Sequence, residues 1–89
     1  MKRFDWNDDK NKLLIAERNI CFEDIIIAME QGFLLDILDH PNKDKYTNQK
    51  IFIVQIDHYV FMVPFVEDDQ EIFLKTIIPS RKATRQYKK

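Results

Sequence analysis

The sequence predicts an α+β fold, with two N-terminal helices packed on one face of a mainly antiparallel sheet of about four strands and a short C-terminal helix. Apolar side chains recur at helical spacing between residues 22 and 31. Residues 49–78 divide into apolar segments separated by short polar turns, which is typical of consecutive antiparallel strands. The 89 residues are predicted to form one domain, 1–89.

The helices have recognisable ends. Asn7 or Asp8 can cap a first helix, and Asn19 can close it in the left-handed conformation. The second helix, over residues 22–31, is expected to end at Gly32, the only glycine of the chain. These signals favour two short helices joined by a brief extended link.

The strands are bounded by turn residues. Asp57–His58 predicts a two-residue hairpin loop, residues 67–70 form the next turn, and residues 39–46 form a loop. Pro64 is expected near a bulge or where the ladder frays, because proline cannot donate a ladder hydrogen bond. The predicted strands cover residues 33–38, 49–56, 59–66 and 71–78, with residues 4–6 as a further short strand or an apolar plug.

The turns also predict a register. If Ile56 faces Tyr59 and Val66 faces Glu71, the alternation of strand side chains separates an apolar face from a mixed face. The mixed face is expected to be partly open or covered by a partner, with Lys75 opposite Met62. The apolar face, to be covered by the helices, would hold Lys50, Phe52, Val54, Ile56, Tyr59, Phe61, Val63, Phe65, Ile72, Leu74, Thr76 and Ile78.

Charge is segregated along the chain. Residues 75–89 contain six of the fourteen Lys and Arg residues and none of the fifteen Asp and Glu residues, so this tail carries +6 and the preceding 74 residues carry −7. A basic end beside an acidic body indicates contact with phosphate or with an acidic partner. Pro79 ends the last strand, and Ser80 can cap a terminal helix on which Arg81 and Arg85 share one face.

Several classes of site are not indicated. The lone Cys21 fits a reducing compartment, and no apolar run approaches the ~20 residues that span a bilayer, which together predict a soluble cytoplasmic protein without membrane contact. A Gly-rich phosphate loop and zinc-ligand spacing are absent, so neither a cofactor nor a metal is expected. His40 and His58 fall in a loop and a turn.

The remaining candidates are basic residues of the tail together with one phenol. Arg81 and Arg85 can clamp phosphate, Lys82 and Lys75 supply point charges, and Tyr87 could stack on a base. Such a set can bind RNA, or cleave it by stabilising the charge on a pentacovalent phosphate. A solvated helix with favourable charges at its carboxyl end is the alternative.

Three segments carry a resemblance to a known family. The opening FDWNDDKN, the segment ERNICFEDI and the closing IIPSRKATRQY resemble the motifs of the BrnT toxins of bacterial toxin–antitoxin pairs. The closing segment is similar to the family's Ile–Ser–Ala–Arg–Lys–Ala–Thr followed by further Arg and Tyr. The resemblance covers nearly the whole chain.

The resemblance implies a RelE-like fold and a metal-independent endoribonuclease that inhibits translation. It implies RNA as substrate, a BrnA-like antitoxin as partner in a possible homodimer or hetero-oligomer, and contact with DNA only through the antitoxin. Arg81, Lys82 and Arg85 match the family's closing motif and become the catalytic candidates. Lys50 and Lys75, with Tyr87, become the RNA-binding candidates.

One departure from the family favours an alternative. The family's Lys–His–Gly corresponds here to Glu17–Arg18–Asn19, and arginine keeps its proton near neutral pH. Arg18 therefore cannot replace a histidine in proton transfer. The alternative is a non-catalytic binding module, a former toxin that retains only its protein-partner interface.

Overall fold

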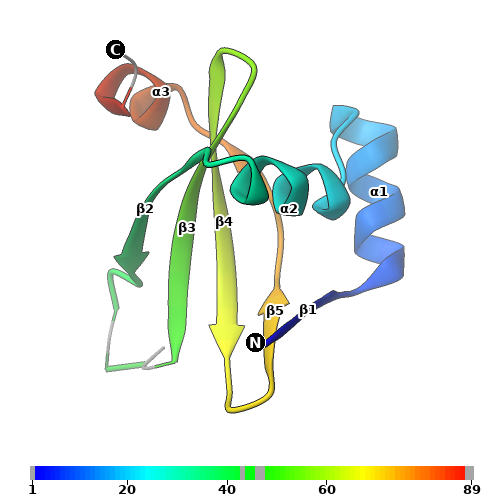
Figure 1. Ribbon diagram of the computed structural model, residues 1–89, viewed down its shortest axis with the longest axis vertical. Helices are drawn as coiled ribbons and strands as arrows, with labels where there is room; N and C mark the ends of the chain where they lie inside the picture. Colours follow the sequence, from blue (N-terminus) through cyan, green and yellow to red (C-terminus); the bar gives the residue numbers. More distant parts are fainter. Residues whose placement is uncertain (1, 43, 46–47, 88–89) are drawn as a thin grey trace.

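The computed structural model describes residues 2–42, 44–45 and 48–87 and shows the predicted α+β class (Figure 1). The described residues form three helices and a mostly antiparallel sheet of six strands, where the sequence predicts about four and leaves residues 4–6 open as a further one. The sheet order is β1-β5-β4-β3-β2, and β6 pairs with β4. The elements are β1 (Arg3–Trp6), α1 (Asp8–Arg18), α2 (Phe22–Glu30), β2 (Leu34–Asp39), β3 (Gln49–Ile56), β4 (Tyr59–Glu67), β5 (Glu71–Leu74), β6 (Ile78–Pro79) and α3 (Arg81–Tyr87).

The predicted helix ends are confirmed. The Lys10 N–H donates to Asn7 Oδ1 over 2.9 Å, which satisfies a free donor at the start of α1. Asn19 ends this helix with φ of 55°, a left-handed conformation that asparagine adopts more readily than most residues. Gly32 follows α2 with φ of 92°, where a side chain would be strained.

A buried asparagine joins the two N-terminal helices. Asn11 is only 8% exposed, and its Oδ1 accepts a 2.8 Å hydrogen bond from the first N–H of α2, that of Phe22. Its Nδ2 donates to Glu23 Oε1, also over 2.8 Å. Because each buried polar atom has a partner, the asparagine fixes the angle between α1 and α2 at little cost.

The hairpin register was predicted correctly, but the next one was not. In the β3–β4 pair Ile56 faces Tyr59, and Asp57 has φ of 56° in the turn. In the β4–β5 pair Val66 faces Phe73 instead of Glu71. The turn is longer than predicted, because Asp68 Oδ1 accepts hydrogen bonds from the Gln70 and Glu71 N–H groups and keeps these residues in the turn. A shift of two residues preserves the faces.

The first strand pairs with a distant segment. The β1 segment runs parallel to β5, with Phe4 beside Ile72 and Trp6 beside Leu74. This pairing decides between the two predictions for residues 4–6 in favour of a strand. It also places α1 beside the β1–β5 side of the sheet, while α2 crosses its face (Figure 1).

The predicted last strand is broken by one extra residue. Phe65 pairs with Leu74, but Met62 pairs with Ile78, so four residues on this strand lie opposite three on β4. The extra residue lies within 75–77 and moves the side chains that follow it to the other face of the sheet. As a result Ile77 is fully buried (0% exposed) and Ile78 is 42% exposed, the reverse of the prediction. Pro64 lies at this gap: its carbonyl accepts from the Lys75 N–H, so its missing N–H would face the interrupted ladder.

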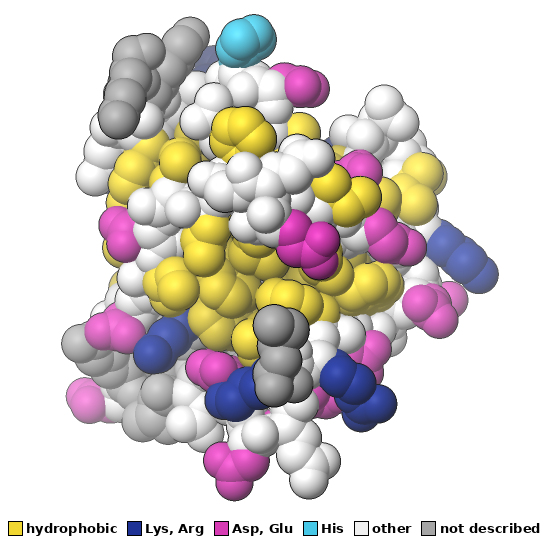
Figure 2. All heavy atoms as spheres, in the orientation of Figure 1, with side chains coloured by type: hydrophobic (Ala, Val, Ile, Leu, Met, Phe, Trp, Pro, Cys, Tyr) yellow, Lys and Arg dark blue, Asp and Glu magenta, His cyan; other side chains and the backbone are white. Residues whose placement is uncertain are grey.

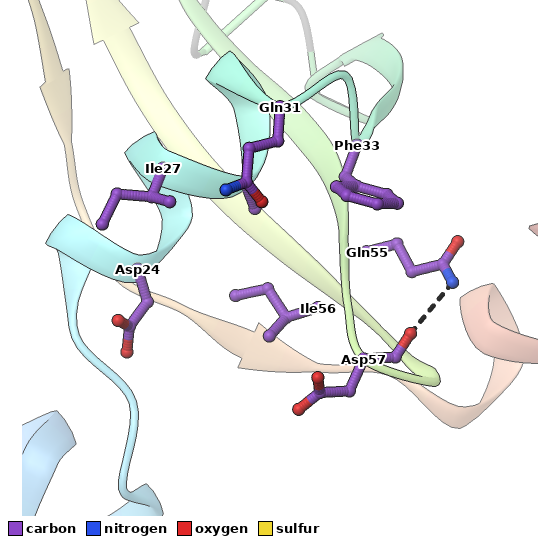
Figure 3. Close-up of a pocket in the computed structure, with 8 residues that line it drawn as sticks. Asp24, Ile27, Gln31, Phe33, Gln55, Ile56 and Asp57 are labelled. Carbon is purple, nitrogen blue, oxygen red and sulfur yellow. Dashed lines mark hydrogen bonds between the residues drawn. The ribbon is translucent and has the colours of Figure 1, made fainter.

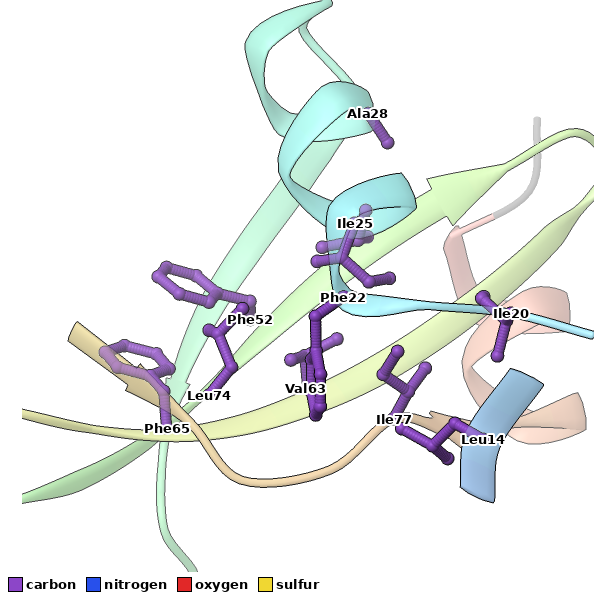
Figure 4. Packing of buried hydrophobic residues seen from close by; sticks show 11 residues of the cluster. Leu14, Ile20, Phe22, Ile25, Ala28, Phe52, Val63, Phe65, Leu74 and Ile77 are labelled. Carbon is purple, nitrogen blue, oxygen red and sulfur yellow. The ribbon is translucent and has the colours of Figure 1, made fainter. Parts of the chain in front are cut away.

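The sheet has an apolar cluster on each face. The larger one lies between the sheet and the first two helices, where the rings of Phe52 and Phe65 stack at 3.8 Å (Figure 4). Phe22 and Ile25 of α2 and Leu14 of α1 complete it. Figure 2 views the face that α2 crosses, where acidic and basic side chains both border the exposed apolar surface. The smaller cluster, under α3, contains Ile51, Ile53, Val60 and Ala83, with Leu35, Met62 and Tyr87 packed against it.

Candidate functional site

The helix that carries the predicted site is fixed to the edge of β4. The Ser80 N–H donates to the Val60 carbonyl, and the Val60 N–H donates to Thr84 Oγ1 over 2.9 Å. The Thr84 hydroxyl in turn donates to the Ser80 carbonyl over 2.7 Å, and Ser80 Oγ caps α3 by accepting from the Ala83 N–H. These bonds hold α3 beside the start of β4.

Two of the predicted catalytic residues share a cavity. Arg81 and Arg85, one turn apart on α3, line an open cavity of about 330 Å³ together with Tyr59 and Thr84. Both arginines are exposed, so their guanidinium groups remain hydrated and accessible to a ligand. No carboxylate belongs to the lining in the described part of the chain. The cavity therefore has the charge and the donors that a phosphate requires.

The third predicted catalytic residue lies elsewhere. Lys82 lines a separate groove of about 270 Å³ above the smaller apolar cluster, with Met62, Gln86 and Tyr87 among its neighbours. On a helix, residues 81 and 82 are about 100° apart, so Lys82 cannot share the face of its neighbour. The structure thus separates the set Arg81, Lys82 and Arg85 into an arginine pair and a lone lysine.

Tyr87 is held by the sheet. Its hydroxyl donates a 2.9 Å hydrogen bond to Asp36 Oδ2 of β2, and its ring packs against the smaller cluster. The hydrogen bond to the Asp36 carboxylate raises the pKa of Tyr87. To stack on a base, this ring would have to leave both contacts. Packing of Tyr87 beside Ala83 on the sheet follows from their helical spacing.

Lys50 of β3 and Lys75, which directly follows β5, do not join the arginines. The Lys75 Nζ donates to Gln49 Oε1 over 3.2 Å, and its N–H bonds to Pro64, so the predicted position opposite Met62 is wrong. Lys50 is near the start of β3, where it pairs with Phe65, and it belongs to the face of the sheet opposite α3. Tyr59, which lines the arginine cavity, pairs with the last residue of β3, so Lys50 is at the other end of this strand. The predicted RNA-binding set of Lys50, Lys75 and Tyr87 is therefore dispersed.

Arg18 has a structural contact that the sequence did not reveal. Its Nη1 donates a 2.6 Å hydrogen bond to the Ile77 carbonyl, in the interruption between β5 and β6. The bond links the end of α1 to the segment that leads into α3. The sequence held no signal for it, because the acceptor is a backbone carbonyl 59 residues away. Arg18 therefore supports the path of the chain into α3.

A second cavity has the opposite electrostatic character. It has a volume of about 320 Å³ and lies between α2 and the β3–β4 turn (Figure 3). Asp24 and Asp57 contribute carboxylates, Ile27 and Phe33 are 51% and 44% exposed, and no basic residue belongs to the described lining. A polyanion would be repelled here, whereas a cationic or apolar group would fit.

The described residues contain no group of three or more His, Cys, Asp or Glu side chains that could hold a metal ion. None of the helices in the described ranges is long and apolar enough to cross a membrane. No protein-family model matches the chain, and comparison with curated proteins and with solved structures also gives no match.

Proposed function

We propose that this chain is a BrnT-like endoribonuclease toxin with a RelE-like fold, neutralised by a BrnA-like antitoxin. The observation that carries the proposal is the cavity in which Arg81 and Arg85 meet Tyr59 without any carboxylate in the described lining. It is supported by the tail's charge of +6 and by the resemblance of the opening and closing segments to the toxin family.

The arginine pair can support metal-independent cleavage of RNA. Attack of a ribose 2′-hydroxyl oxygen on the adjacent phosphorus forms one P–O bond, and the hydroxyl proton passes to water. The bond to the 5′ oxygen of the next nucleotide breaks, and this oxygen takes up a proton from water and leaves as a hydroxyl, so the other product is a 2′,3′-cyclic phosphate. Negative charge accumulates on the phosphoryl oxygens in the transition state, and guanidinium groups stabilise it. Thr84 contributes shape rather than chemistry, because its hydroxyl already bonds to Ser80 and Val60.

Inducible expression without the antitoxin tests this function in cells. We expect growth arrest and decay of cellular RNA, and we expect both to disappear in the Arg81→Ala/Arg85→Ala double variant. The matched control is Lys12→Ala/Arg3→Ala, which removes the same charge from exposed positions outside the cavity. If the arginine variant remains fully toxic, the assignment of Arg81 and Arg85 to the site is wrong. If cells that express the unmodified chain grow without arrest, the proposed toxin function is wrong.

One observation favours the alternative of a non-catalytic binding module. The cavity of Figure 3 combines the exposed side chains of Ile27 and Phe33 with the carboxylates of Asp24 and Asp57, which is the chemistry of a surface for a basic, apolar protein segment. The occupant we propose is such a segment of the antitoxin. If this is the chain's whole function, the purified protein binds the product of the adjacent gene and leaves RNA intact, and Ile27→Asp weakens that complex.

A further inference from the structure

We propose that Tyr59 is the base-recognition residue of the arginine cavity, and that the ligand is single-stranded RNA. One nucleobase stacks on the Tyr59 ring while a neighbouring phosphate lies between Arg81 and Arg85. This inference rests on the proposed function and specifies its substrate class. It assigns Tyr59 a role that the sequence motifs of the tail did not indicate.

The first argument is position. Tyr59 comes from the face of β4 opposite α3, since it pairs with Ile56 while the next residue, Val60, belongs to the cluster beneath the helix. It nevertheless lines the same cavity as both arginines, because the cavity lies at the edge of β4 where α3 begins. A base on the phenol and a phosphate on the guanidinium groups can therefore be bound together.

The second argument is preorganisation. The Tyr59 ring is half-buried and packs against Phe61, with ring centroids 5.5 Å apart and planes tilted by 55°. Its backbone is fixed in the register of the β3–β4 hairpin, beside the turn at Asp57. A ring already held in place loses little conformational freedom when a base stacks on it, so more of the stacking energy remains available for binding.

The third argument is that the other candidate phenol is engaged. Tyr87 donates to Asp36 and packs on the smaller cluster, and it lines the groove of Lys82 rather than the arginine cavity. Tyr59 is the aromatic residue of the arginine cavity within the described part of the chain. The residue that can stack on a base in this cavity is therefore Tyr59 and not Tyr87, which the sequence suggested.

The geometry also selects the class of nucleic acid. A base can stack on a protein ring only after it leaves its own helix, so an unpaired strand meets this requirement at the lowest cost. A duplex would instead need a continuous track of cations along the phosphates. Lys50 and Lys75 do not extend such a track from the arginines, because they lie at other parts of the sheet.

Two strands of equal length test the stacking role directly. The probes are a short labelled single-stranded RNA and a strand of the same length whose sugars carry no bases, both with the 2′-oxygen methylated to prevent cleavage. We expect the intact chain to prefer the strand with bases, and Tyr59→Leu to weaken its binding by about five- to 150-fold while leaving the base-free strand almost unaffected. Tyr59→Phe retains the ring and should keep the preference.

The outcomes separate this inference from the function on which it rests. Arg81→Ala/Arg85→Ala should weaken binding of both strands, because it removes contacts with phosphate. If the arginine variant weakens binding of both strands but Tyr59→Leu keeps the full preference for the strand with bases, the stacking role of Tyr59 is overturned and the proposed function stands. If the arginine variant binds both strands as tightly as the intact chain, the proposed function itself fails. Thermal unfolding of each variant verifies that it is folded at the assay temperature.

Discussion

The Tyr87 hydroxyl donates a 2.9 Å hydrogen bond to the Asp36 carboxylate, and this bond joins the end of the C-terminal helix to the edge strand β2. The two residues are 51 positions apart in the chain. Val60 accepts from the Ser80 N–H and donates to Thr84 Oγ1, and with these two bonds the contact to Asp36 holds α3 at both ends. The positions of Arg81 and Arg85 are therefore set by the sheet rather than by the helix alone.

Removal of this hydrogen bond should loosen α3 slightly. We expect Tyr87→Phe to lower Tm by about 4 °C or less, because the ring still packs on the smaller cluster and only the polar contact is lost. Tyr87→Ala should cost more, since it also removes the packing. Differential scanning calorimetry measures both, and equal Tm values for the two variants would contradict the packing described for this ring.

The same bond predicts a pH dependence at the alkaline end. The Asp36 hydrogen bond raises the pKa of Tyr87 above its usual value of 10.0, so the contribution is complete below pH 10 and is lost as the pH rises through the folded-state value. Stability should thus fall more steeply above pH 10 in the intact chain than in Tyr87→Phe. Denaturation at pH 8 to 11 tests this, and parallel curves would show that the bond makes no contribution.

The break between β5 and β6 is tested by two neighbouring isoleucines. Ile77→Ala should reduce the free energy of unfolding by about 2–5 kcal/mol, since it leaves a cavity in the larger cluster. Ile78→Ala, at an exposed position, should cost no more than about 0.5 kcal/mol. Urea denaturation of the two variants decides between the observed break and the uninterrupted strand predicted from sequence, which would reverse their order.

Local chemistry explains how much of the fold could be predicted. Helix caps and tight turns depend only on the few residues around them, so they can be predicted without knowledge of the rest of the chain. This holds for Asn7, Asn19, Gly32 and the turn at Asp57. The parallel pairing of Arg3 with Glu71 has no local signal, because its partners are far apart in the sequence. The extra residue before Ile78 is equally hidden, since it depends on how the chain passes Pro64.

Asn11 provides a test of the joint between the first two helices. Asn11→Ala should destabilise the chain by about 1–3 kcal/mol, because the buried Phe22 N–H loses its acceptor. The exposed neighbour Lys12→Ala is the matched control and should change stability little. Chemical denaturation at neutral pH compares them, and equal midpoints would contradict a structural role for the asparagine.

The contact with Glu23 adds a pH signature to that variant. The hydrogen bond from Asn11 lowers the pKa of Glu23 below its usual value of 4.5, so its contribution is present above that value and is lost as the pH falls through the folded-state pKa. The deficit of Asn11→Ala should therefore be larger at pH 7 than at pH 3. A deficit that stays constant across this range would mean that Glu23 is not coupled to Asn11.

The candidate site was predictable only as a set of charges. The tail's composition pointed to Arg81 and Arg85, and their helical spacing places both on one face. Their aromatic neighbour could not be found in this way, because Tyr59 reaches the cavity from the other face of β4 and belongs to a different segment. Lys82 was grouped with the arginines because it is next to Arg81 in the sequence. In a helix, adjacent residues point about 100° apart, so Lys82 lines a different groove.

The most direct test of the central claim is cleavage of single-stranded RNA by the purified chain in the presence of EDTA. The account predicts cleavage without metal, lost by at least about 100-fold in Arg81→Ala/Arg85→Ala and retained in Lys50→Ala/Lys75→Ala, which removes the same charge away from the cavity. Equal loss in both variants would attribute the effect to net charge. Cleavage unchanged in the arginine variant would contradict the proposal that this cavity is the site of the chemistry.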